Sequence, residues 1–130
     1  MKKILVLIVF MILLTGCDNG NIKDISLKEL NSKFENKETF ILYFEGKDSQ
    51  TLEKTLNKVL ENNNLTAYTI DTSELNQDEI NELRMNADYE SPSIVFIIEG
   101  RDPSVITHIT DNYIQENELT TRLKDLNFIK

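Results

Sequence analysis

Apolar residues recur along the chain in two patterns, one typical of helices and the other typical of buried strands. Apolar side chains at three- and four-residue spacing predict helices over about 26–36, 49–61, 76–85 and 115–127. Short apolar runs predict strands at 39–44, 65–71, 93–98 and 105–109. Strands that alternate with helices imply parallel crossovers, whereas the turn at 99–103 implies an antiparallel hairpin. The sequence therefore predicts an α/β fold with a mixed four-stranded central sheet flanked by helices.

The amino-terminal segment has the layout of a secretory signal. Lys2 and Lys3 precede an unbroken apolar run over 4–14, which small residues follow. Eleven helical residues reach only about 16 Å, roughly half of a hydrocarbon core of ~30 Å. The run is therefore too short for a membrane span.

The tetrapeptide Leu14-Thr15-Gly16-Cys17 resembles the lipobox of bacterial lipoproteins. The resemblance implies a diacylglyceryl group on the sulfur of Cys17, cleavage just before this residue, and membrane lipid as a partner. The alternatives are an ordinary signal peptide, or an uncleaved anchor with a cysteine placed by chance. We expect residues 1–16 to be the signal peptide, 17–24 a lipidated tether, and 25–130 a domain on the extracytoplasmic face of the cell membrane.

Charge and cysteine content narrow the classes of function. The formal net charge of the whole chain is −8, and it becomes −10 when two lysines leave with the signal. Nucleic-acid phosphates and anionic lipid headgroups would repel such a body, so we expect no nucleic-acid partner. Cys17 is the only cysteine. The domain therefore has no intramolecular disulfide, and its stability must come from packing.

The order of elements over about 25–128 resembles the thioredoxin fold, and three local features support this resemblance. A buried strand ending at Phe44 leads through a short loop into a long helix. Ser91-Pro92-Ser93 stands directly before a strand, as the cis-proline segment of that family does. Glu99-Gly100 follows where family members turn between their last two strands. By itself, Ser91-Pro92-Ser93 would favour a trans proline that breaks the chain before a strand, and only the matching order of elements favours the cis form.

The residues that perform redox chemistry in thioredoxins are replaced in this chain. The resemblance places the two cysteines of the Cys-x-x-Cys motif at Ser49 and Leu52. Tyr43 stands where the family often has a buried aspartate, and Asp48 where an aromatic residue commonly precedes the first cysteine. Disulfide exchange needs an attacking thiolate and a resolving thiol. We therefore expect a redox-inactive domain that is not a dithiol oxidoreductase and needs no cofactor.

Other chemistry at this site has little support from the residue pattern. A serine that begins a helix, such as Ser49, is usually an N-cap, and a hydrolase would also need a base nearby. The only histidine, His108, lies on the predicted last strand. One histidine and scattered carboxylates give no recognisable metal-ligand spacing.

A thioredoxin fold without cysteines can still bind an extended peptide, because pairing along a strand uses main-chain groups. We expect a groove lined by two segments of the chain: Gly46, Lys47, Asp48 and Ser49, and Ser91, Pro92 and Ser93. Residues 41–49 are also similar to accessory proteins of bacteriocin export, which implies a role near peptide secretion. The alternatives are a structural envelope lipoprotein and an enzyme with non-thiol chemistry near Ser49 or Asp48.

Overall fold

The structure is a computed structural model, and it describes residues 21–100, 107–109 and 113–130. The predicted signal peptide and the lipobox with Cys17 lie outside the described residues. The same holds for parts of the predicted turn at 99–103 and strand at 105–109.

The described elements follow the predicted order with two additions, a strand at the start and a short 3₁₀ helix over 72–74. Five helices and five strands have these bounds: β1 Ile22–Asp24, α2 Leu27–Glu35, β2 Phe40–Phe44, α3 Gln50–Asn62, β3 Ala67–Thr69, the 3₁₀ helix η1 Thr72–Glu74, α4 Gln77–Ala87, β4 Ser93–Ile97, β5 Thr107–Ile109 and α5 Glu116–Asp125. The predicted helices and strands are all present, with ends that differ by a few residues.

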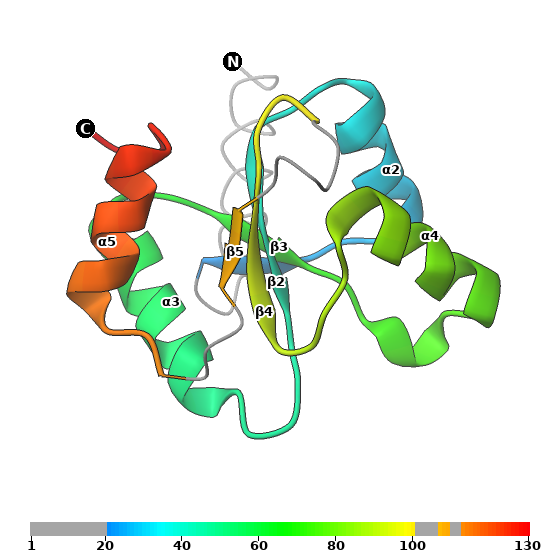
Figure 1. The fold of residues 1–130 in the computed structure, drawn as a ribbon, viewed down its shortest axis with the longest axis horizontal. Coiled ribbons are helices and arrows are strands. Elements are labelled where there is room, and N and C mark those ends of the chain that lie inside the picture. Colours follow the sequence, from blue (N-terminus) through cyan, green and yellow to red (C-terminus); the bar gives the residue numbers. More distant parts are fainter. Residues whose placement is uncertain (1–20, 101–106, 110–112) are drawn as a thin grey trace, which may run out of the picture.

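The strands form one mixed sheet in the order β1-β3-β2-β4-β5 (Figure 1). β1, β3 and β2 are parallel, whereas β4 is antiparallel to β2 and β5 is antiparallel to β4. The parallel crossover between β2 and β3 and the antiparallel pairing of β4 with β5 agree with the sequence analysis.

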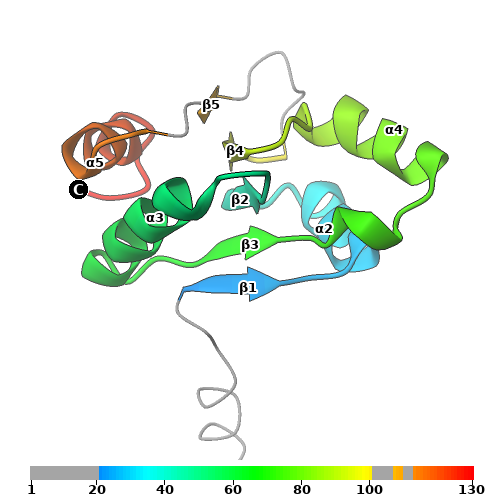
Figure 2. The same ribbon diagram turned by 90° about the horizontal axis from the view of Figure 1, so that it is seen from below.

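Two helices cover each face of the sheet (Figure 2). α3 and α5 lie on one face, where Leu56 and Leu123 pack against Ile41 and Phe96. α2 and α4 lie on the other, where Leu30 and Leu83 share a second cluster with alternate residues of β2 and β4. All five residues of β2 and all five of β4 are buried, as expected of central strands covered on both faces.

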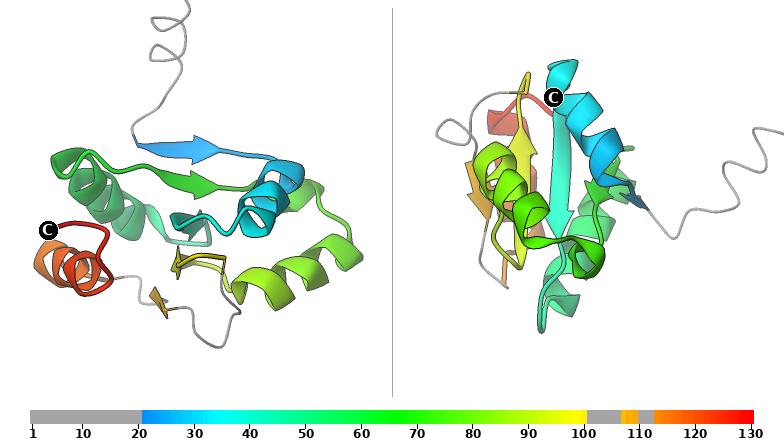
Figure 3. Two further views of the ribbon diagram at one scale, coloured as in Figure 1. Left: turned by 90° about the horizontal axis from the view of Figure 1, so that it is seen from above. Right: turned by 90° about the vertical axis from the view of Figure 1, so that its right-hand side faces the viewer.

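β1 is an addition to the four predicted strands. It lies at the edge of the sheet beside β3 (Figure 3), with Ile22 level with Ala67 and Asp24 level with Thr69. Its sequence, Ile-Lys-Asp, has one apolar residue, so it contains no apolar run that the sequence analysis could recognise, and its residues are half-buried or exposed. The sheet thus begins at Ile22, within the segment 17–24 that we expected to be a tether.

Side-chain caps explain where two of the helices begin. The Asn76 side chain accepts a hydrogen bond from the Glu79 N–H at 2.9 Å, and the Glu79 carboxylate accepts one from the Asn76 N–H at 3.1 Å. This reciprocal capping box starts α4. At α2, Ser26 accepts from the Glu29 N–H at 3.1 Å, which supplies the serine half of the same arrangement.

None of the helices within the described ranges is long and apolar enough to cross a membrane.

The core position of Phe96 gives a first test of this architecture. Phe96 is fully buried in β4, so Phe96→Ala should lower the free energy of unfolding by about 3–5 kcal/mol through lost apolar contact and the cavity it leaves. Met85 is 73% exposed on α4, so Met85→Ala should change it by no more than about 0.5 kcal/mol. Urea unfolding followed by circular dichroism measures both. Equal effects of the two substitutions would contradict the described core.

Candidate functional site

The two segments predicted to line a groove come together at one end of the central strands (Figure 1). β2 ends at Phe44 where β4 begins at Ser93, and these two residues are partners in the antiparallel ladder. The loop that follows β2 therefore meets the loop that precedes β4. The sequence prediction that 46–49 and 91–93 are neighbours is consistent with this register.

The contact between the loops is close. The Ser91 hydroxyl donates to the carbonyl of Glu45 at 2.6 Å. A Cβ atom placed on Gly46 would lie 2.7 Å from the Pro92 nitrogen and 2.8 Å from its Cδ. Only glycine allows the main chain at position 46 to approach the proline ring this closely.

The Ser91–Pro92 peptide bond is cis, as the resemblance implied. Ser93, the next residue, is fully buried and its hydroxyl donates to the carbonyl of Glu90. Ser91 itself is exposed and Pro92 is half-buried. No backbone hydrogen bond joins the Ser91 main chain to another described residue. A main-chain edge is thus available to an extended ligand beside the proline.

The remaining loop residues differ in accessibility. Lys47 and Asp48 are exposed, and Asp48 adopts a left-handed conformation with φ of 61°, which aspartate tolerates better than most residues. Ser49 is only 3% exposed. Lys47 and Asp48 can therefore contact a ligand directly, whereas Ser49 lies beneath the loop.

The Ser49 hydroxyl is the centre of a small hydrogen-bond network. It donates to the Gly46 carbonyl at 2.9 Å, and it accepts from the Gly46 N–H at 3.1 Å and from the Tyr43 hydroxyl at 3.0 Å. One donor and two acceptor positions are all that a serine hydroxyl has. The sequence analysis interpreted Ser49 as an N-cap. It does occupy that position before α3, but its side chain makes no capping bond because it turns toward Gly46 and Tyr43 instead.

Tyr43 lies on β2 beneath the loop, at the position where the resemblance to thioredoxins places an aspartate. Burial raises the pKa of its hydroxyl, and the nearby carboxylates of Glu53 and Glu45 raise it further, while the hydrogen bond to Ser49 lowers it. The phenol therefore stays protonated at neutral pH and acts as a hydrogen-bond donor, not as a base.

The position at which the resemblance places the second cysteine belongs to the core. Leu52 is fully buried in the cluster beneath α3 and α5. Neither of the two positions thus presents a reactive group at the surface.

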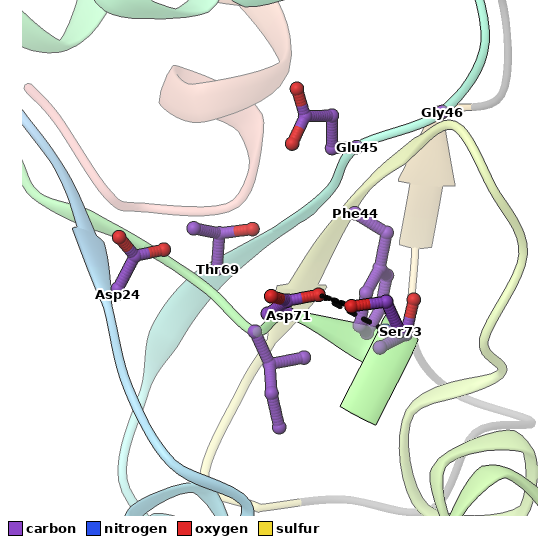
Figure 4. A pocket seen from close by; sticks show the side chains of 9 residues that line it. Asp24, Phe44, Glu45, Gly46, Thr69, Asp71 and Ser73 are labelled. Atoms are coloured by element: carbon purple, nitrogen blue, oxygen red, sulfur yellow. Dashed lines mark hydrogen bonds between the residues drawn. The ribbon is translucent and has the colours of Figure 1, made fainter. Parts of the chain in front are cut away.

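A hollow of about 450 Å³ opens beside the same loop, at the carboxyl ends of the three parallel strands (Figure 4). Its lining comes from Asp24 of β1, from Phe44, Glu45 and Gly46 at the end of β2, and from Thr69, Ile70, Asp71, Thr72 and Ser73 at the end of β3. Among the lining residues there are three carboxylates and no basic side chain. The Asp71 carboxylate accepts from the Ser73 hydroxyl at 2.6 Å and from its N–H at 3.0 Å, which lowers the Asp71 pKa.

The sequence analysis did not identify this hollow. Its residues are far apart in sequence and meet only because β1, β3 and β2 run parallel and end at the same edge. The polar residues that follow each strand were the available signal, since ligand sites of α/β sheets often lie at the carboxyl ends of strands.

No group of three or more potential metal ligands was found in the part of the chain that the structure describes. The side chain of His108 lies outside the described part, so the structure does not place it relative to the loops.

Comparisons with known proteins identify the fold. No protein-family model and no curated protein matches the sequence significantly. Solved structures do match. Thioredoxin O2 from Arabidopsis thaliana is 15% identical, with a TM-score of 0.59 over 84% of this chain and 96% of that one. Chloroplastic thioredoxin z is 20% identical, with the same TM-score and the same coverage of both chains. Thioredoxin from Trypanosoma brucei brucei is 14% identical, with a TM-score of 0.58 over 87% and 96%. The domain therefore has the thioredoxin fold, in agreement with the predicted fold class.

Gly46→Ala tests the contact between the two loops. The added methyl group would meet the Pro92 main chain and the Ser91 hydroxyl at 2.7 Å, so the loops would have to move apart. We expect the free energy of unfolding to fall by about 1–3 kcal/mol, as overpacking usually costs. Lys47→Ala, at the exposed next position, is the control and should have almost no effect. Urea unfolding measures both, and an equally small effect of Gly46→Ala would contradict the described contact.

Proposed function

We propose that this protein is an extracytoplasmic lipoprotein, anchored through Cys17, whose redox-inactive thioredoxin-like domain binds an extended segment of a peptide or protein. The loop segments 46–49 and 91–93 form the groove, and within them Ser49 and Ser93 are buried beneath its surface. The observation that carries the proposal is the accessible main chain of Ser91 beside Pro92, next to a loop that has no thiol.

The surroundings of Ser91 support binding along the main chain. An extended peptide can pair with an unpartnered N–H and C=O as an added strand does, and such pairing requires no thiol. Lys47 and Asp48 stand exposed at the rim, where they can contact side chains of the ligand. The adjoining hollow adds a concave surface that a flat structural spacer would not need.

The same contacts favour binding over hydrolysis at Ser49. An activated serine has its hydroxyl hydrogen directed at a general base. The Ser49 hydroxyl instead donates to a backbone carbonyl, is almost fully buried, and has its acceptor positions filled. The similarity of residues 41–49 to accessory proteins of bacteriocin export makes secreted peptides the partner class to test first.

The lipid anchor can be tested independently of the groove. The full chain should fractionate with membranes, and the mass of its amino-terminal fragment should correspond to a diacylglyceryl group on Cys17. Cys17→Ser removes the only acceptor sulfur, so most of that variant should lack the lipid and leave the washed membrane fraction. An unmodified thiol on Cys17 of the membrane-bound wild type would contradict the anchor.

The groove can be tested by site-specific crosslinking in the native membrane. A photo-crosslinking residue at Lys47 should capture a discrete partner in the lipidated full chain. The control is the same residue at Lys124, an exposed position near the end of α5, because α5 runs away from the loops (Figure 1).

Pro92→Ala should reduce capture from Lys47 by about tenfold, because one or two main-chain hydrogen bonds of ~0.5–1.5 kcal/mol each would lose their alignment. Circular dichroism would establish that this variant folds. Capture of the same partner with equal yield from Lys47 and Lys124, or an unchanged yield in folded Pro92→Ala, would contradict the proposed groove.

A further inference from the structure

From the contacts beneath the loop we infer that Tyr43 and Ser49 are positioning residues, which hold Gly46 in the conformation that the peptide groove requires. This inference rests on the proposed function, since it assigns a role to residues that lie under the proposed groove and do not touch the ligand.

The first step concerns the main chain of Gly46. Both of its polar groups bind the same hydroxyl, because its N–H donates to the Ser49 Oγ at 3.1 Å and its carbonyl accepts from the Ser49 Oγ at 2.9 Å. The Ser49 side chain thereby closes the tight turn 46–49. The N–H of Gly46 is therefore used within the turn and its carbonyl already accepts one hydrogen bond, whereas the Ser91 main chain has no described backbone partner.

The second step concerns Tyr43. Its hydroxyl donates to the Ser49 Oγ at 3.0 Å from the centre of the sheet, where Tyr43 is 2% exposed. The tyrosine thus connects the loop to β2, a strand whose every residue is buried. The Ser49 hydroxyl has only one hydrogen, and the bond from Tyr43 leaves it to be donated to the Gly46 carbonyl.

The third step connects this network to the proline side of the groove. The position of Gly46 is limited from the opposite side by Pro92, which a Cβ on Gly46 would approach to 2.7 Å. The carbonyl of Glu45, the preceding residue, accepts a hydrogen bond from the Ser91 hydroxyl at 2.6 Å. A shift of Gly46 would therefore change the gap beside Pro92 and the orientation of Ser91 together.

Hydrogen exchange of the lipidated full chain in detergent, read by mass spectrometry, tests this role. In Ser49→Ala, the fragment around Gly46 should exchange about tenfold faster, since a main-chain bond is lost locally, while the fragment that covers β4 keeps its wild-type rate. Tyr43→Phe should accelerate the same fragment by a smaller factor. Ser32→Ala, at an exposed serine on α2, is the matched control and should change neither fragment.

Photo-crosslinking of the partner from position Lys47 provides the functional readout. The yield of crosslinked partner should fall severalfold in Ser49→Ala, while this variant keeps its fold. The inference is overturned if the Gly46 fragment is no faster than in Ser32→Ala, or if both fragments accelerate equally. It is also overturned if Ser49→Ala captures the partner as well as wild type does, a result that leaves the proposed function intact. A wild type that captures nothing specific from Lys47 overturns the proposed function and, with it, this inference.

Discussion

The antiparallel pairing of β2 with β4 is the constraint on which the candidate site depends. It sets Phe44 opposite Ser93. The loop that follows β2 and the loop that precedes β4 must therefore lie at the same end of these strands. Both strands are buried on both faces, and a slip of one residue would exchange their two apolar clusters. The packing of four helices therefore determines the register. The register in turn places Gly46 against Pro92, without any covalent link between the loops.

Fold and chemistry separate clearly in this molecule. The domain has the fold of thioredoxins that are 14–20% identical to it, and it has the cis proline at the expected place. At the two positions where the resemblance places the cysteines, however, it has a buried serine with a fully occupied hydroxyl and a leucine that belongs to the core. A shared fold does not carry a shared activity, and the side chains at the site decide what chemistry remains. Neither of these two side chains is a thiol.

The sequence predicts those features that local patterns determine. The apolar spacing of the helix over 76–85 and the apolar run of β2 are properties of a few consecutive residues, and both elements are present in the structure. β1 was missed because three partly exposed residues become a strand only by pairing with β3, which is distant in sequence. The direction of the Ser49 side chain was missed for a related reason. Local propensity favours an N-cap at this position, but a tyrosine from the neighbouring strand competes for the hydroxyl. Likewise, only the fold brings together the three strand ends that line the acidic hollow.

The exchange of a thiol for a hydroxyl also changes what controls the shape of the loop. In a dithiol site, formation and reduction of a bond between the two sulfurs couple the loop to the redox state of the compartment. Ser49 cannot take part in such exchange, and its three hydrogen bonds depend only on the positions of Tyr43 and Gly46. Tyr43 is itself held by the core, and its raised pKa keeps the donor hydrogen in place at neutral pH. The loop is thus shaped by the same packing that stabilises the sheet. A loop held in this way keeps one geometry in an oxidising or a reducing environment.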